Sequence, residues 1–233
     1  MDEQIIIQSI IALSFYADPS AVASYGLSQL QTNSYLPYGP TDWLATRFKE
    51  WHECPFKSSH ALISALSDIT GEQVDLDHWR LSYPEHGSEA DKVASSSKSC
   101  KWNCTFHFKP ITSQKLGDGV HNHVTDVWNS VGEDDWVGLI YLNPHAPIDT
   151  GLYLWENVNP AKNYDWMTPA ENWKLIDSLG AVFNRLILTQ GRQPHSGANG
   201  FSNVLEEGRL YQTFFFKTKR KRLFPGVSLG KLM

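Results

Sequence analysis

Cysteine is scarce in this chain, with 3 residues among 233. Cys54, Cys100 and Cys104 are an odd number. The Cys100-x-x-x-Cys104 spacing has neither a second cysteine pair nor a nearby histidine pair that would complete a zinc site. We therefore expect reduced thiols rather than a disulfide framework, which is typical of a cytoplasmic protein.

An excess of positive charge and a long apolar run are also missing. The 20 Lys and Arg residues against 25 Asp and Glu give a formal net charge of -5 and a pI of about 6.0. This balance argues against a protein held on nucleic acid by phosphate contacts. The N-terminal isoleucines follow Asp2 and Glu3 and are interrupted by Gln8 and Ser9, so they fit neither a signal peptide nor a membrane span. We expect no nucleic-acid partner and no membrane association, and the sequence leaves the oligomeric state open.

Helices are predicted to dominate the first hundred residues, after an opening strand over 5–15. Asp18-Pro19 is typical of an N-cap followed by proline at the first helical position, and Gly71 is a typical helix end. The polar segment 79–99 is expected to be a loop. The predicted helices are 21–30 after Asp18-Pro19, 43–51 after Thr41-Asp42, and 61–69 after Ser58 or Ser59.

Strand patterns begin at Trp102. Apolar and polar residues alternate over 102–109, which is typical of a strand with one apolar face, and 136–143 is a continuous apolar run that predicts a buried strand. Short strands preceded by helices predict a β-sandwich or an open barrel buttressed by helices on one side. The other predicted elements are strands over 150–155, 184–188 and 209–216, and a helix over 169–179 within an insertion at 157–179.

The length favours a single domain. The basic run from Lys217 to Arg222 has no aromatic residues interleaved with it, so it is expected to be a solvated tail. The expected parts of the domain are helical support and a loop over 1–100, a β core over 101–217, and the tail over 218–233.

A cluster of possible metal ligands lies directly before the buried strand. His121, His123 and Asp126 stand close together, and His195 follows far downstream. Three N or O ligands on one face of an ion, with open positions opposite, are what a non-haem Fe(II) oxygenase needs. The other histidines have no partner at ligand spacing and are expected to lie at the surface or in the core: His52, His60, His78, His86, His107 and His145.

The order of features after this cluster carries a family resemblance. The chain continues with a strand ending in Tyr141-Leu142-Asn143, then Gly151-x-x-x-Trp155, an apolar strand leading to Pro194-His195, and Arg209 on a late strand. Over about residues 100–217 this order resembles the Fe(II)/2-oxoglutarate-dependent dioxygenases, in particular the prolyl-hydroxylase-like subgroup with its uncharacterised bacterial and phage members. The resemblance implies a double-stranded β-helix, or jelly roll, in an α+β, mainly β chain. It also implies a hydroxylase that uses Fe(II), 2-oxoglutarate and O₂ and releases succinate and CO₂.

The first ligand pair of that family is usually His-x-Asp, and this sequence departs from it. Two sets remain open, namely His123-x-x-Asp126 with His195, and His121-x-His123 with His195. Residues two apart on a strand point to the same face, which favours the two histidines. The distance from Asp126 to the strand of Tyr141 is similar to that in the family and favours the carboxylate, so His123, Asp126 and His195 form the leading set. Whichever of His121 and Asp126 does not bind the metal is expected to interact with one of the metal ligands and hold it in place.

The resemblance also implies a basic residue that binds 2-oxoglutarate on the strand after the distal histidine. Arg209 fits by order, and a guanidinium matches a carboxylate with two parallel hydrogen bonds. Tyr211 shares its strand face, and Tyr141 resembles the family tyrosine that hydrogen-bonds the distal carboxylate of the cosubstrate. Alternatives are an Arg209 paired with a neighbouring acidic residue, and a different anchor close to His195; the residues concerned are Glu206, Glu207 and Arg192.

Two other functions stay open. One is a cupin-like metalloenzyme that uses His121, His123 and His195 without 2-oxoglutarate, and the other is a metal-free jelly-roll binding module. For an oxygenase, we expect a small-molecule or peptide substrate, such as an amino acid, a peptide side chain or a modified nucleotide. The segments 79–99 and 157–179 are expected to cross the barrel mouth and set specificity, because loops on a rigid scaffold carry recognition groups.

Overall fold

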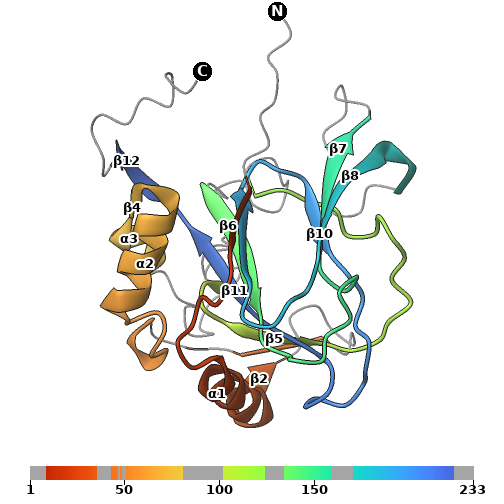
Figure 1. The fold of residues 1–233 in the computed structure, drawn as a ribbon, viewed down its shortest axis with the longest axis horizontal. Coiled ribbons are helices and arrows are strands. Elements are labelled where there is room, and N and C mark those ends of the chain that lie inside the picture. The colour runs from red at the N-terminus through yellow and green to blue at the C-terminus, as the bar shows by residue number, and fades with distance from the viewer. Residues whose placement is uncertain are drawn as a thin grey trace, which may run out of the picture.

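Two antiparallel sheets dominate the protein. The computed structural model describes residues 9–35, 43–46, 48, 51–80, 102–123, 134–158 and 170–222. Figure 1 shows the smaller sheet on one side of the larger sheet and the helices on its other side and at one end. The larger sheet runs in the order β1 (Ser9–Ala12), β9 (Leu186–Gln190), β6 (Trp136–Tyr141), β11 (Arg209–Phe216), β5 (Phe106–Lys109), β3 (Leu44–Thr46) and β2 (Ser34–Tyr35).

The smaller sheet has the order β10 (His195–Gly197), β7 (Leu152–Asn157) and β8 (Trp173–Leu179). An isolated bridge between His121 and His195 adds a fourth position to it. From β5 onward the chain crosses between the sheets: β5 lies in the larger sheet, His121 in the smaller, β6 in the larger, β7 and β8 in the smaller, β9 in the larger, β10 in the smaller and β11 in the larger. This order is that of a jelly roll. The predicted α+β, mainly β fold with a double-stranded β-helix is confirmed.

Strand β11 separates two cores because alternate side chains point to opposite faces. Phe214 and Phe216 pack toward the helices, in a cluster that also contains Phe106 and residues of the helical layer. Tyr211 points into the space between the sheets, where Leu139, Tyr141, Ile187 and residues of β7 and β8 surround it. Each fully buried apolar side chain stabilises the fold by about 1.5–3 kcal/mol.

Two helices begin and end as predicted. Helix α1 (Pro19–Thr32) has Asp18 as N-cap, whose side chain accepts a hydrogen bond from Ala21 N, and proline at its start. Helix α2 (His60–Thr70) has Ser59 as N-cap and ends at Gly71, which has a φ of 69°. Such a left-handed conformation costs glycine little, so it is a favoured helix end.

The predicted helix over 43–51 is wrong. Residues Leu44–Thr46 form β3, which pairs with β5 and β2, and Trp51–Glu53 form a short 3-10 helix. Ala45 and Thr46 are fully buried, and Thr46 Oγ1 accepts a hydrogen bond from Phe106 N at 2.9 Å. Pairing with β5 therefore outweighs the local capping pattern.

The predicted helix over 169–179 is also wrong. Trp173, Ile176 and Leu179 recur every three residues, which suits a helix face, but they lie in β8 and pair along the whole of β7. Only Ala170–Asn172 form a single 3-10 turn. The pairing supplies hydrogen-bond partners to the exposed edge of β7 that a helix would not supply.

The expected loop and tail need correction where the structure describes them. Trp79 belongs to α3 (Leu76–Trp79), is fully buried, and donates a hydrogen bond from Nε1 to the Lys57 carbonyl at 2.7 Å. Residues 218–222 form β12 (Thr218–Arg222), which pairs with β4 (Glu72–Val74). Its basic character is partly matched by acid, since Lys219 Nζ lies 3.4 Å from Asp75 Oδ1. The rest of both segments, 81–99 and 223–233, lies outside the described residues.

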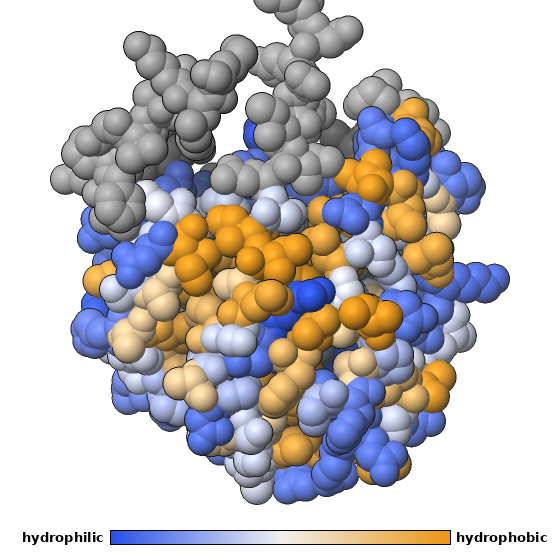
Figure 2. All heavy atoms as spheres, viewed as in Figure 1, coloured by the Kyte–Doolittle hydropathy of each residue, from blue (hydrophilic) through white to orange (hydrophobic). Residues whose placement is uncertain are grey.

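Cys54 and Cys104 are free and buried, as predicted for reduced thiols, while Cys100 lies outside the described residues. At the surface, the edge strand β1 and the residues after it expose Ile11 and Leu13. Figure 2 shows apolar side chains gathered over the middle of the face seen in Figure 1. No helix in the described ranges has both the length and the apolar character needed to cross a membrane.

Candidate metal and anion site

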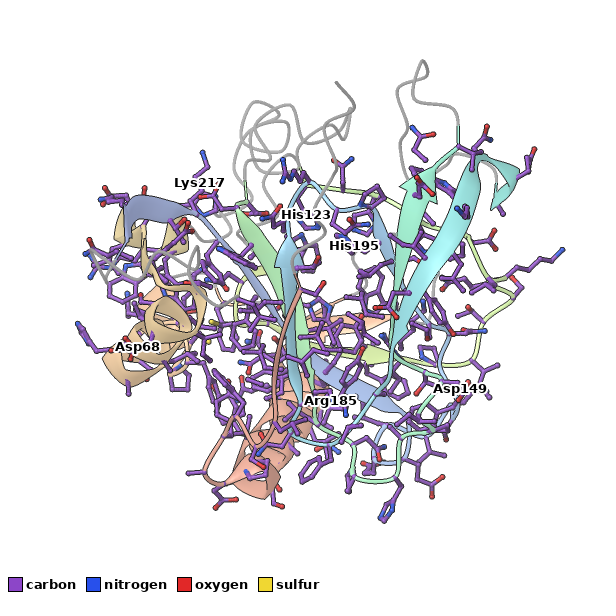
Figure 3. All side chains as sticks on the ribbon, turned by 45° about the horizontal axis from the view of Figure 1, so that its top comes forward. Asp68, His123, Asp149, Arg185, His195 and Lys217 are labelled. Carbon is purple, nitrogen blue, oxygen red and sulfur yellow. The ribbon has the colours of Figure 1, made fainter. Side chains whose placement is uncertain are left out.

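Three histidines meet between the two sheets. His121, His123 and His195 each offer one ligand nitrogen, and these nitrogens lie within 4.8 Å of one another. Backbone hydrogen bonds hold them in place: His121 and His195 exchange both N–H···O bonds across the bridge, and His123 N donates to the Gly191 carbonyl at 2.7 Å. Figure 3 shows His123 and His195 close together at one end of the barrel.

The second ring nitrogen of each histidine has an acceptor. An acceptor at Nδ1 places the proton there and leaves the lone pair on Nε2, which is the arrangement found in metal-binding histidines. His123 Nε2 is a buried atom without any hydrogen-bond partner. The three Nδ1 contacts are His121 with the Gly119 carbonyl at 2.9 Å, His123 with Asp134 Oδ2 at 3.0 Å and His195 with the Gln193 carbonyl at 2.8 Å.

Burial holds the rings of His123 and His195 neutral. Burial lowers the pKa of His123 well below its ordinary value, and the neighbouring His121 lowers it further. Burial lowers the pKa of His195 in the same way, with His121 and His123 as further causes. A metal ion binds only the neutral imidazole, so no proton has to be displaced at neutral pH. The orphaned nitrogen of His123 and the set of nitrogen donors thus fit a divalent transition metal ion such as Fe(II).

Close packing fixes the ring of His123. The Phe215 ring stacks on it at 4.9 Å between centroids. On the other side, Gly191 lets the chain of Asp134 approach, because a Cβ on this residue would lie 1.9 Å from the Asp134 carbonyl oxygen. Any larger residue at 191 would therefore push the chain of Asp134 away from His123. It would weaken the hydrogen bond that His123 Nδ1 donates to the Asp134 carboxylate.

The structure brings together three of the four predicted ligands, namely His121, His123 and His195. Asp126 lies outside the described residues. The set of His123, Asp126 and His195 therefore stays a prediction, and the described residues bring together all three members of the alternative, all-histidine set.

Arg209 lies in the same barrel interior, further along β11. It is 2% exposed. Its Nε donates to the Thr150 carbonyl at 3.0 Å and its Nη2 to the Gly151 carbonyl at 3.3 Å. The guanidinium lies 4.4 Å from the centre of the Tyr211 ring, a cation–π contact. No carboxylate in the described part of the chain forms an ion pair with it, so the predicted alternative of pairing with Glu206 or Glu207 is wrong.

Tyr141 and Lys109 flank the arginine. The Tyr141 hydroxyl is buried and has no hydrogen-bond partner, and burial raises the pKa of this phenol against the opposing effect of Arg209. Lys109 pairs with Arg209 across β5 and β11, and its Nζ donates to Gln114 Oε1. Burial, and then the charge of Arg209, lower the pKa of Lys109 to about 7. Arg209, the half-buried Lys109 and the buried Tyr141 hydroxyl thus lie near one another without a described acidic partner, an arrangement that an anion would stabilise.

The reserve anchor lies elsewhere, because Arg192 is exposed and donates from Nε to Gln190 Oε1 at 2.8 Å. His107 was expected to be an ordinary surface or core histidine. Its ring stacks on Tyr211 at 5.1 Å, and its Nε2 lies 2.7 Å from Thr105 Oγ1. Burial lowers the pKa of His107 to about 3, with Arg209 as a second cause, so His107 is a neutral core histidine beside Tyr211.

Sequence reasoning missed the residues that support the site from other elements. The sequence places Asp134 in an acidic turn and does not indicate its contact with His123. It places Lys109 on the polar face of an alternating strand and does not indicate that Arg209 lies beside it. The one available signal was position, because Asp134 comes two residues before the buried strand β6. Their roles come from contacts between segments far apart in the sequence.

Comparison with known proteins gives likenesses of fold. No protein-family model matches the chain, and no curated protein matches its sequence. Similar solved structures include a prolyl hydroxylase from Trichoplax adhaerens in complex with a peptide fragment of the hypoxia inducible factor oxygen degradation domain, with 16% identity, a TM-score of 0.45, and coverage of 94% of this chain and 87% of that one. A Pseudomonas putida prolyl-4-hydroxylase has 11% identity, a TM-score of 0.43, and coverage of 94% and 96%. The non-heme alpha ketoglutarate dependent epimerase SnoN from nogalamycin biosynthesis has 9% identity, a TM-score of 0.44, and coverage of 90% and 77%.

These likenesses assign no activity at such identities and TM-scores. The fold itself is established by the strand order, and the chemistry has to be argued from the side chains of this chain.

Proposed function

We propose that this protein is an Fe(II)- and 2-oxoglutarate-dependent oxygenase. One observation carries the proposal. The same barrel interior contains three histidine nitrogens that could hold a metal ion and a buried arginine that has no described carboxylate partner. A metal ion and a dicarboxylate would satisfy both features together. In the described residues His121, His123 and His195 would hold the metal, and Asp126 is the alternative third ligand carried over from the sequence.

When bound, Fe(II) with 2-oxoglutarate and O₂ supplies an oxidative decarboxylation that yields succinate and CO₂ and oxidises a C–H bond of the substrate. The part of the protein is to present Nε2 atoms of fixed tautomer and to leave the remaining coordination positions open. Phe215 stacks on the His123 ring, and His123 and His195 are both buried, so water is largely excluded from these two rings. Exclusion of water strengthens every charge interaction inside.

Arg209 would bind the far carboxylate of 2-oxoglutarate. A carboxylate there would accept hydrogen bonds from the guanidinium and from the Tyr141 hydroxyl, and would face the Lys109 ammonium. The Tyr211 ring packs against one face of the Arg209 guanidinium. Burial raises the pKa of the Tyr211 hydroxyl, so this side chain is neutral. The anion would neutralise the buried Arg209, favour the protonated form of the half-buried Lys109 and give a partner to a buried hydroxyl, so its binding should be strong.

The proposed substrate is a small molecule or a peptide, such as an amino acid, a peptide side chain or a modified nucleotide. Parts of the two segments expected to set specificity belong to the folded scaffold. Trp79, at the start of 79–99, is fully buried, and residues 173–179, at the end of 157–179, form β8. The segments 81–99 and 159–169 remain the proposed specificity regions, and they lie outside the described residues.

The test is succinate formation from 2-oxoglutarate by the purified protein with candidate substrate pools, with and without Fe(II). Succinate that requires both Fe(II) and the native histidines, together with a mass gain of one oxygen in a pool component, supports the proposal. His145→Ala is the matched control, because His145 is exposed and is not a member of the histidine cluster. Succinate release that is equal in His145→Ala and His195→Ala would mean that this site does not catalyse the reaction.

A cupin-like metalloenzyme without 2-oxoglutarate is the second candidate, because the described cluster consists of histidines alone. If this candidate is correct, the protein should bind the metal, and replacement of Arg209 by methionine should change neither the metal affinity nor the metal-dependent activity. Calorimetry with 2-oxoglutarate separates the two candidates, since only the oxygenase binds this anion at Arg209.

A further inference from the structure

A carboxylate on the far side of His123 is shared by two histidines. Asp134 Oδ2 lies 3.0 Å from His123 Nδ1, and Asp134 Oδ1 lies 3.3 Å from His78 Nε2. The Asp134 side chain is 1% exposed and the His78 side chain 12%. The second contact is a close electrostatic approach rather than an aligned hydrogen bond, and it joins the helical layer to the metal cluster.

The main chain fixes the tautomer of His78. Lys217 N donates a hydrogen bond to His78 Nδ1 at 3.3 Å, so Nδ1 carries the lone pair and the proton is on Nε2. The nitrogen that carries this proton is the one that lies 3.3 Å from Asp134 Oδ1. Figure 3 shows Lys217 at the same end of the barrel as His123. The resulting order of contacts is Lys217 N–H, His78, Asp134, His123.

Helix α3, which carries His78, is held against the larger sheet. Asp75 N donates to the Lys217 carbonyl at 2.9 Å. The Trp79 ring is fully buried against Phe216, with 6.0 Å between centroids. With one residue anchored on each side, His78 has little freedom to turn away from Asp134.

We propose that His78 is a positioning residue for the metal site, which holds the Asp134 carboxylate in place and through it the ring of His123. The inference rests on the metal site of the proposed function and is independent of 2-oxoglutarate. A metal-binding histidine is oriented by the acceptor of its other N–H, and loss of such an acceptor typically weakens metal affinity about 10- to 100-fold. Without His78, Asp134 Oδ1 loses the imidazole nitrogen that lies 3.3 Å from it, and the carboxylate can turn away from His123.

The experiment measures Co(II) binding by the purified full chain, from the d–d absorption and from competition with a chelator. His78→Gln should weaken Co(II) binding about 3- to 10-fold, because its contact is long, and Asp134→Ala about 10- to 100-fold. Both should alter the shape of the d–d spectrum, which a loss of stability alone does not do. The matched control is His60→Gln, since His60 is exposed on α2 in the same helical layer. It should bind Co(II) as the wild type does.

A double-variant cycle tests whether His78 acts through Asp134. If it does, His78→Gln should have no further effect on Co(II) affinity in the Asp134→Ala background. Equal effects of His78→Gln in both backgrounds, or wild-type affinity and spectrum in His78→Gln, would overturn the inference. Wild-type protein that binds no Co(II) would overturn both the inference and the proposed function. Stoichiometric Co(II) binding without any binding of 2-oxoglutarate would defeat the proposed function alone.

Discussion

Replacement of Arg209 by methionine tests the anion site most sharply. Methionine keeps much of the volume of the side chain but removes a guanidinium that is 2% exposed and has no described carboxylate partner. A charge-assisted hydrogen bond contributes about 1.5–3 kcal/mol. With desolvated partners on both sides, we expect a loss of about 2–3.5 kcal/mol of binding free energy, which is about 30- to 300-fold weaker binding of 2-oxoglutarate.

The fold should tolerate this change. The Thr150 and Gly151 carbonyls lose a donor, which costs about 1–3 kcal/mol each. Removal of an uncompensated buried cation offsets much of that cost. We therefore expect Tm to fall by no more than about 5 °C. Arg209→Lys keeps the charge but not the planar fork, so its affinity should lie between those of the wild type and the methionine variant.

The assay is calorimetry of 2-oxoglutarate binding to Mn(II)-loaded protein, which undergoes no turnover. Arg192→Met is the matched control, because Arg192 is exposed and was the other candidate anchor. Wild-type affinity in Arg209→Met, or a loss of affinity in Arg192→Met alone, would refute the assignment of the anion site to β11.

Other predictions concern the same interior. Burial and then Arg209 lower the pKa of Lys109 to about 7; the ammonium loses its proton as pH rises through that value, so 2-oxoglutarate affinity should fall from about pH 6 to about pH 9, and Lys109→Met should flatten this profile in calorimetry. If the described histidine set is the metal site, His121→Ala should abolish stoichiometric Co(II) binding while Asp126→Ala retains it, and the opposite result would establish the carboxylate set. Gly197→Val should weaken 2-oxoglutarate binding about 10-fold without loss of Co(II) affinity, because a Cβ at 197 would lie 3.2 Å from Arg209 Nη2; unchanged anion affinity would show that the guanidinium does not need its present position.

The sequence predicts the parts of the fold that local patterns determine. The caps Asp18 and Ser59 act within one helical turn, and the apolar run that becomes β6 is buried whatever surrounds it. The segments 43–51 and 169–179 carry helix-like patterns, but their state is set by pairing with β5 and β7, which are distant in the sequence. Propensity is a weak guide where such pairing decides the structure.

The site shows the same division. His121 and His123 could be paired from strand alternation, and Arg209 from its place on the last barrel strand. The link from His78 through Asp134 to His123 could not, because its members come from a helix, a turn and a strand end that only the folded chain brings together. Lys109 is of the same kind, since only the pairing of β5 with β11 places it beside Arg209.

The central claim is that one barrel interior binds Fe(II) and 2-oxoglutarate together. The most direct measurement is an anaerobic titration of the protein with Fe(II) and then with 2-oxoglutarate, followed by visible absorption and calorimetry. The account predicts one Fe(II) per chain, then one 2-oxoglutarate with a new metal-to-ligand absorption band, and loss of the band in both His195→Ala and Arg209→Met. Stoichiometric Fe(II) binding followed by neither heat nor a band on addition of 2-oxoglutarate would contradict it.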